Sequence, residues 1–275
     1  MQFLLLGQLT VLDDRGASLD LGGLKQRAVL GALLVHPNEV VRKTELIDWL
    51  WASSPPASAS HSVDVYVSRL RRLLGSDADR LASVAGGGYR LRVDRDDLDS
   101  ARAELLLDRA ADQEAIGDLP GAAAAIAEAL ELFRGPVLGD LSEFGFATSE
   151  VVRLEALQPL MMERQGELEL ACGGSADLVG RLEAQVAAYP DRERLWELLM
   201  LAHYHAQNQP AALATFDRAR RYLTDEYGVD PGPALTELHR RILRQDDSLP
   251  ARPPPASRDG TRPSEVRDDR RRRWR

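Results

Sequence analysis

The side chains with the clearest chemical potential lie in the stretch 60–75. Read at 100° per residue, this stretch is a helix, and one of its faces combines basic and small residues with a lone valine. That face holds His61, Ser62, Val65, Arg69 and Arg72. An arginine can donate two hydrogen bonds to the O6 and N7 atoms of guanine, and a valine can contact the methyl group of thymine. The pattern therefore indicates a helix that reads bases in the DNA major groove.

The opposite face of the same helix would anchor it to a core. Its apolar stripe consists of Val63, Val67, Leu70 and Leu74. Ser58 or Ser60 can cap the start of the helix, and Gly75 can end it. A solvated basic face with no partner would show the same charge pattern, so the neighbouring elements have to distinguish the two interpretations.

The segments around this helix complete a winged helix-turn-helix. Residues 80–84 and 89–93 alternate as two short strands, and the glycines at 86–88 separate them as a hairpin turn. Upstream, the pattern predicts strands at 3–6, 9–12 and 18–21, a buried helix at 24–35 and a second helix at 45–51 that Thr44 caps. A helix followed by a β-hairpin is the second half of a winged helix-turn-helix.

The second part of the chain is predicted to be all helical. The expected helices are 98–115, 119–133, 148–171, 176–189, 193–206, 210–222 and 233–245. One pair matches much of the tetratricopeptide pattern, with Trp196-x2-Leu199 followed by Ala212-x3-Phe216-x2-Ala219. Small residues at these positions let paired helices approach closely, and the aromatic ring fills the gap between them.

Charge divides the chain into unlike parts. Residues 1–95 carry 12 basic and 10 acidic side chains, whereas residues 96–249 carry 14 basic and 29 acidic ones. The candidate DNA-binding part is therefore nearly neutral and its neighbour is strongly acidic. An acidic domain suits a protein partner better than a phosphate backbone.

The segments VDVYVSRLRR at 63–72 and GYRL at 88–91 resemble the recognition helix and wing of OmpR-type DNA-binding domains. Over residues 1–247 the chain resembles the Streptomyces antibiotic regulatory protein (SARP) family of transcriptional activators. The resemblance implies an α+β, OmpR-type winged helix-turn-helix with an N-terminal β-sheet at 1–95. An all-α, tetratricopeptide-like bacterial transcriptional activation domain would follow at 96–247. Residues 248–275 have the composition of a disordered basic tail.

The same resemblance implies how the chain would act. It predicts a homodimeric activator that binds tandem repeats in double-stranded promoter DNA and recruits RNA polymerase, through sigma and core subunits, to antibiotic gene clusters. Arg69 is expected to read bases, with Val65 and Ser62 close to them. The residues expected mainly to hold phosphates are Arg71, Arg72, His61, Trp51 and Tyr89. The loop 52–57 is either a polymerase contact or a plain turn. OmpR-type wings often carry an arginine at the tip, where this chain has Ala85, which argues against minor-groove readout by the wing.

The weak positive charge of residues 1–95 leaves an alternative open. In this alternative the chain is an interaction module whose winged helix binds a protein instead of DNA. A positive surface favours DNA, and a surface whose charge is cancelled favours protein. The deciding charges are Arg69, Arg72 and Lys43 on one side and Asp64, Asp77 and Asp79 on the other.

The sequence offers no sign of catalysis, a cofactor or a metal site. Cys172 is the single cysteine, which excludes an intrachain disulfide and a cysteine-based zinc site. His203 and His205 are two positions apart, so on a helix they point away from each other and do not share a metal, unlike i, i+4 pairs. No apolar run approaches the ~18 residues of a membrane helix, so we expect a cytoplasmic, nucleoid-associated protein without a membrane partner.

Overall fold

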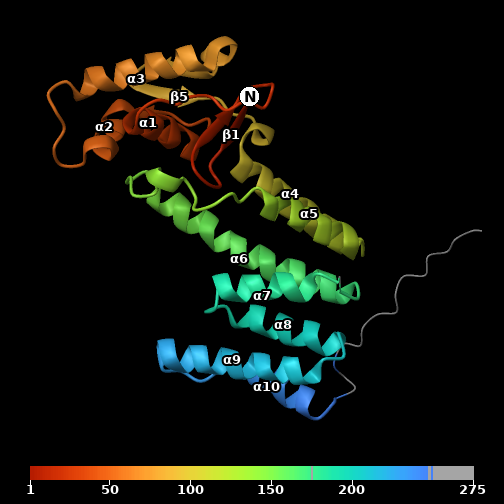
Figure 1. The fold of residues 1–275 in the computed structure, drawn as a ribbon. Coiled ribbons are helices and arrows are strands. Elements are labelled where there is room, and N and C mark those ends of the chain that lie inside the picture. Colours follow the sequence, from red (N-terminus) through yellow and green to blue (C-terminus); the bar gives the residue numbers. More distant parts are fainter. Residues whose placement is uncertain (175, 247–248, 250–275) are drawn as a thin grey trace, which may run out of the picture.

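The chain folds into an α+β unit followed by a stack of helices, as the sequence predicts (Figure 1). The computed structural model describes residues 1–174, 176–246 and 249, so most of the predicted tail lies outside the described residues. The first unit contains β1 (Gln2–Leu4), β2 (Thr10–Leu12), α1 (Leu24–Val35), β3 (Val41–Arg42), α2 (Lys43–Trp51), α3 (Ala59–Leu74), the 3-10 helix η1 (Gly75–Arg80), β4 (Leu81–Val84) and β5 (Gly88–Leu91). The helical part contains η2 (Arg95–Asp97), α4 (Asp99–Ala115), α5 (Leu119–Glu131), η3 (Gly139–Leu141), α6 (Thr148–Ala171), α7 (Leu178–Ala188), α8 (Glu193–His205), α9 (Gln209–Tyr227) and α10 (Pro233–Leu243).

The N-terminal sheet is smaller than predicted. β1 and β2 pair antiparallel, but the expected third strand at 18–21 is reduced to a single bridge to β2. The chain turns there because the carboxylate of Asp20 accepts a hydrogen bond from the amide of Gly22 at 2.9 Å. β1 also ends early, because the amide of Leu5 donates to the carboxylate of Asp99 at 2.7 Å and the following amide does the same.

Helices α1 to α3 and the sheet of β3, β5 and β4 form the winged helix-turn-helix. β5 lies in the middle of this sheet and pairs antiparallel with both neighbours. α2 begins at Lys43, earlier than predicted, and the prediction that Thr44 caps it is wrong. The amide of Arg42 instead donates to the carboxylate of Glu45 at 2.8 Å, which closes the start of this helix.

The two-faced character predicted for α3 is confirmed. The four residues of its apolar stripe, Val63, Val67, Leu70 and Leu74, are at most 2% exposed. The helix starts after Ser58, whose side chain makes no cap hydrogen bond, and ends at Gly75, whose positive φ of 57° is one that glycine adopts readily. Burying this stripe leaves the opposite face at the surface.

The helical part stacks its elements in sequence order, so each helix packs against the next (Figure 1). The predicted tetratricopeptide-like pair is formed by α8 and α9, and Trp196, Ala212, Phe216 and Ala219 are all buried between elements. α9 continues to Tyr227, past the predicted end at residue 222. It ends there because Gly228 adopts a left-handed conformation with φ of 67°, which stops the helix.

One hydrophobic core crosses the predicted boundary at residue 95. Leu98, Val137 and Phe146 belong to the same buried cluster as Phe3 and Leu30 of the winged unit. Asp99 strengthens this junction, since its carboxylate is buried and accepts hydrogen bonds from the backbone after β1. Burial raises the pKa of Asp99, whereas the backbone donors and Arg134 oppose that rise. The two parts are therefore packed together.

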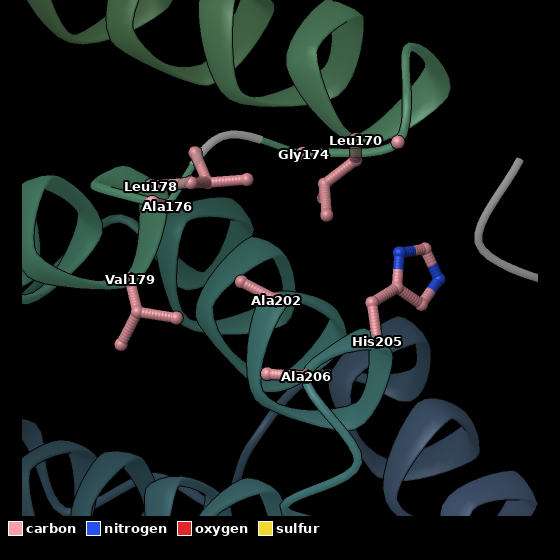
Figure 2. A pocket seen from close by; sticks show the side chains of 9 residues that line it. Leu170, Gly174, Ala176, Leu178, Val179, Ala202, His205 and Ala206 are labelled. Carbon is pink, nitrogen blue, oxygen red and sulfur yellow. The ribbon is translucent and has the colours of Figure 1, made fainter. Parts of the chain in front are cut away.

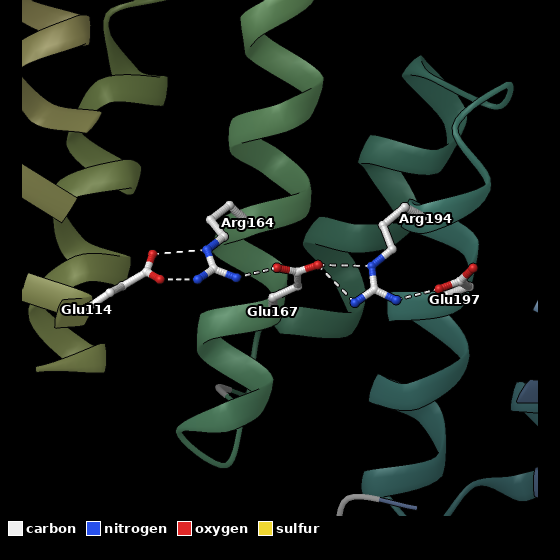
Figure 3. Close-up of polar contacts among 5 residues, drawn as sticks. All are labelled: Glu114, Arg164, Glu167, Arg194 and Glu197. Atoms are coloured by element: carbon white, nitrogen blue, oxygen red, sulfur yellow. Dashed lines mark hydrogen bonds and ion pairs between the residues drawn. The ribbon is translucent and has the colours of Figure 1, made fainter. Parts of the chain in front are cut away.

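A chain of ion pairs links three helices of the stack (Figure 3). Arg164 of α6 donates to Glu114 of α4 with its Nε at 2.9 Å and to Glu167 with Nη1 at 2.7 Å. Glu167 also accepts from Arg194 of α8, which in turn donates to Glu197. Burial alone would raise the pKa of Glu167, but the two arginines hold it below its usual value.

Candidate DNA-binding surface

The outward face of α3 lies at one end of the elongated molecule, opposite the end formed by α9 and α10 (Figure 1). His61, Arg69 and Arg72 are exposed on this face, and Ser62 and Val65 are half-buried beside them. The side chains of Arg69 and Arg72 make no hydrogen bond or ion pair with any other described residue. The structure thus brings together the residues predicted to lie near bases, on one unobstructed helix face.

Arg71 lies on the flank of α3 that faces the wing. Its Nε donates to the carbonyl oxygen of Leu81 at 2.8 Å, and its Nη2 donates to the hydroxyl of Ser83 at 2.8 Å. These two bonds tie α3 to β4, so Arg71 holds the wing against this helix. Its predicted phosphate contact stays a prediction.

Asp64 joins three elements on the same flank. It accepts a hydrogen bond from the hydroxyl of Tyr89 on β5, and its two carboxylate oxygens lie 2.6 and 2.7 Å from Nζ of Lys43 on α2. Burial, followed by Asp64, raises the pKa of Tyr89 to about 12. The bonds from Lys43 and Tyr89 lower the pKa of Asp64. The phosphate role predicted for Tyr89 is untested, and its hydroxyl already has a partner.

Trp51 is the last residue of α2 and lies next to the half-buried ammonium group of Lys25. Nζ of Lys25 lies 4.2 Å from the centre of the Trp51 ring and donates to the carbonyl oxygen of Leu50 at 3.2 Å. Burial lowers the pKa of Lys25. Trp51 is half-buried, so only part of its ring is available for the predicted phosphate contact. All residues of the loop 52–57 that follows are exposed.

The turn of the wing depends on glycine at three positions in two different ways. Gly86 and Gly87 have φ of 93° and 91°, a region that side chains rarely adopt. Gly88 has an ordinary φ, but a Cβ there would lie 2.8 Å from the carbonyl oxygen of Val41. The sequence identified the turn, and it gave no signal for this close approach because β3 is distant along the chain.

The charges around α3 divide between paired and unpaired groups. Lys43 is neutralised by Asp64, and Asp77 lies 3.5 Å from Arg80. Among the residues that the structure describes, Arg69 and Arg72 have no partner, and Arg71 is hydrogen-bonded only to uncharged groups, so no carboxylate neutralises these three arginines of α3. The surface of α3 is positive through these three arginines, and Lys43 contributes less than the sequence predicts because it pairs with Asp64.

Ranges 1–174 and 176–246 contain no cluster of three or more His, Cys, Asp or Glu side chains placed to hold a metal ion. No helix within the described part combines the length and apolar character that crossing a bilayer requires.

Two family models cover most of the described chain. Residues 19–91 match the model described as "Transcriptional regulatory protein, C terminal". Residues 98–243 match the model described as "Bacterial transcriptional activator domain". The two matches meet close to residue 95, between the wing and α4.

Similar proteins are regulators. Regulatory protein AfsR of Streptomyces griseus is 41% identical over 232 residues, which is 84% of this chain and 23% of that protein. Transcriptional regulatory protein MoaR1 of Mycobacterium tuberculosis is 38% identical over 89% of this chain and 80% of its own length. A solved structure of Mycobacterium tuberculosis EmbR, in complex with a low affinity phosphopeptide, aligns with a TM-score of 0.82 and 37% identity. That alignment covers 89% of this chain and 65% of EmbR, so the chain spans only part of AfsR and of EmbR.

Proposed function

Since this chain belongs to the SARP family of transcriptional regulators, which carry an OmpR-type DNA-binding domain and a bacterial transcriptional activator domain, we propose that it activates promoters with tandem repeats by recruiting RNA polymerase. Its relatives are transcriptional regulators and not enzymes. The family resemblance supports antibiotic gene clusters as the targets. We keep residue 95 as the proposed division between the DNA-binding and activation domains, and 247 as the end of the latter.

The observation that carries this proposal is the exposed outward face of α3. Arg69 and Arg72 extend from a helix whose other face is buried, at an end of the molecule that no described element covers (Figure 1). An α-helix presented in this way fits the width of the major groove. Arg69 would read a base, with Val65 and Ser62 beside it, and Arg72 would bind a phosphate.

Other residues would position the domain on the DNA backbone. His61 is exposed at the start of α3 and can approach a phosphate directly. Arg71, Trp51 and Tyr89 have internal partners, so their contribution would come through the wing and the end of α2 that they hold in place. The resulting contacts fix the register without reading sequence.

The proposed protein partners follow from exposure and charge. The loop 52–57 projects beside the recognition helix and is fully exposed, which suits a contact with the sigma or core subunits of polymerase. A homodimer is supported by the proposed tandem sites, because two copies would occupy adjacent repeats. The acidic helical part would stay away from the phosphate backbone.

The test is binding of the purified chain to promoter DNA from its own gene neighbourhood, against random DNA, over a salt series. Replacing Arg69→Ala should cost roughly 1–3 kcal/mol at one base pair and relax specificity there. Arg109→Ala removes an exposed arginine of α4 and should leave binding unchanged. A loss in Arg69→Ala that is equal for all sequences would refute base readout by this residue.

The second candidate function is a winged helix that binds a protein. It is favoured by the pairing of Asp64 with Lys43, which reduces the positive charge of the face. No preference for promoter DNA at any salt concentration would support this candidate, and a hundredfold preference (about 2.7 kcal/mol) would exclude it.

A further inference from the structure

A cavity of about 230 Å³ lies far from α3, where the end of α6, the start of α7 and the end of α8 meet (Figure 2). Its walls are mainly apolar and include Leu170, Leu178, Val179, Ala202 and Ala206. The cavity is larger than the ~150 Å³ cavity that holds a benzene molecule and smaller than pockets for drug-sized ligands. Its size therefore suits a small molecule.

His205 is the polar residue of this cavity. It is the last residue of α8, it is only 8% exposed, and its ring extends from the helix toward Leu170 (Figure 2). Both ring nitrogens are shielded from solvent and have no hydrogen-bond partner in the described part of the chain. Folded proteins rarely bury an imidazole in this state, because both of its hydrogen bonds to water are lost.

Apart from His205, the described residues that line the cavity are aliphatic or glycine, so none of their side chains offers the imidazole a hydrogen bond. We propose that the cavity binds a small, mostly apolar molecule with one hydroxyl or carboxyl group, which forms a hydrogen bond with His205. A neutral imidazole offers one donor and one acceptor, and such a group can pair with either. The apolar body of the molecule would lie against Leu178 and Ala202, which gives the site its shape selectivity.

The test uses phenol and hexanoic acid as probes on the full chain, with toluene as an apolar probe of the same size as phenol. Binding is followed through the imidazole ¹⁵N signals, which are few because the chain has five histidines. Phenol or the acid should shift the His205 signals in a saturable manner, and the spectrum of His205→Phe identifies those signals. Shifts confined to the other histidines would overturn the proposal.

Variants separate the hydrogen bond from the cavity. In His205→Phe the ratio of phenol affinity to toluene affinity should fall at least tenfold, as expected for the loss of one hydrogen bond. Ala202→Leu fills the cavity and should weaken both probes at least tenfold. Ala206→Leu serves the same purpose at the exposed end of α8 if the first variant does not fold. Ala214→Leu, on the exposed face of α9, is the matched control and should bind both probes normally.

Three further results would overturn the proposal. The first is no binding of phenol or hexanoic acid at about 10 mM, a concentration at which ligands of this size bind with ordinary efficiency. The second is an unchanged affinity ratio in His205→Phe. The third is a probe-free spectrum in which both His205 nitrogens already show hydrogen-bonded shifts, since the imidazole would then have its partners within the chain.

Discussion

Replacing Asp64→Asn should make DNA binding tighter at low salt and more sensitive to salt. Asp64 now holds the ammonium group of Lys43 at 2.6 Å, so the cation is not free to bind a phosphate. Each phosphate contact contributes about 0.9 to the slope of log K against log salt concentration. With Lys43 released, the slope should steepen by about 0.9 for each bound protomer. Between about 50 and 200 mM salt, this amounts to a ~3.5-fold larger loss of affinity.

The assay is fluorescence anisotropy with labelled promoter DNA over that salt range. The asparagine oxygen can still accept the hydrogen bond from Tyr89, so the wing should keep its position. Asp77→Asn is the matched control, because it removes the same charge while Arg80 keeps its ion pair with Asp97 at 2.5 Å. Equal slopes in the two variants would refute the reasoning, since only net charge would then matter and the start of α2 would not face the DNA.

Three further predictions concern the elements that hold this surface. Gly88→Ala should destabilise the fold by about 1–3 kcal/mol in chemical denaturation, because its Cβ would lie 2.8 Å from a carbonyl oxygen of β3. Gly180→Ala, at an open helical site, should have no such cost, and equal stability of the two variants would contradict the close approach. Asp99→Asn should also cost about 1–3 kcal/mol, because one amide oxygen replaces two carboxylate oxygens that each accept a backbone amide. Asp96→Asn is the exposed control, and an undiminished unfolding midpoint in Asp99→Asn would argue against the role of that carboxylate. The raised pKa of Tyr89 predicts a pH dependence, since the folded state holds the phenol proton more tightly than the unfolded chain. Its contribution to stability is complete below pH 10 and disappears as the pH rises through about 12, and Tyr89→Phe should flatten the measured stability over that window.

The sequence predicted best where a pattern is local. α3 can be predicted because the sixteen residues of the helix contain both its apolar and its basic face. The helices of the second part can be predicted because proline and glycine residues mark their ends. The prediction of a third N-terminal strand was wrong, because the alternation over 18–21 does not reveal that Asp20 bends the chain.

Contacts between segments that are distant along the chain could not be predicted from local sequence patterns. Residue type alone ranked Arg71 and Arg72 together, yet only the structure shows that Arg71 is committed to the wing. Likewise, Lys43 and Tyr89 lie 21 and 25 positions from Asp64 along the chain, and no periodicity links them. Helical geometry alone was enough to place His61, Arg69 and Arg72 on one exposed face of α3, and their roles on DNA remain predictions.

The core shared by the winged unit and the helical stack holds α3 at a fixed distance and orientation relative to the helices of the second part. Leu98 and Phe146 of the second part are buried together with Phe3 of the winged unit, so the two parts are not joined by a flexible linker. Two copies joined through those helices would present their recognition helices at a single spacing. Major grooves on one side of the duplex recur about every 10–10.5 base pairs, or about 34–36 Å. An operator lengthened by half a turn would therefore face the second helix with the wrong side of the duplex, with no linker to absorb the difference.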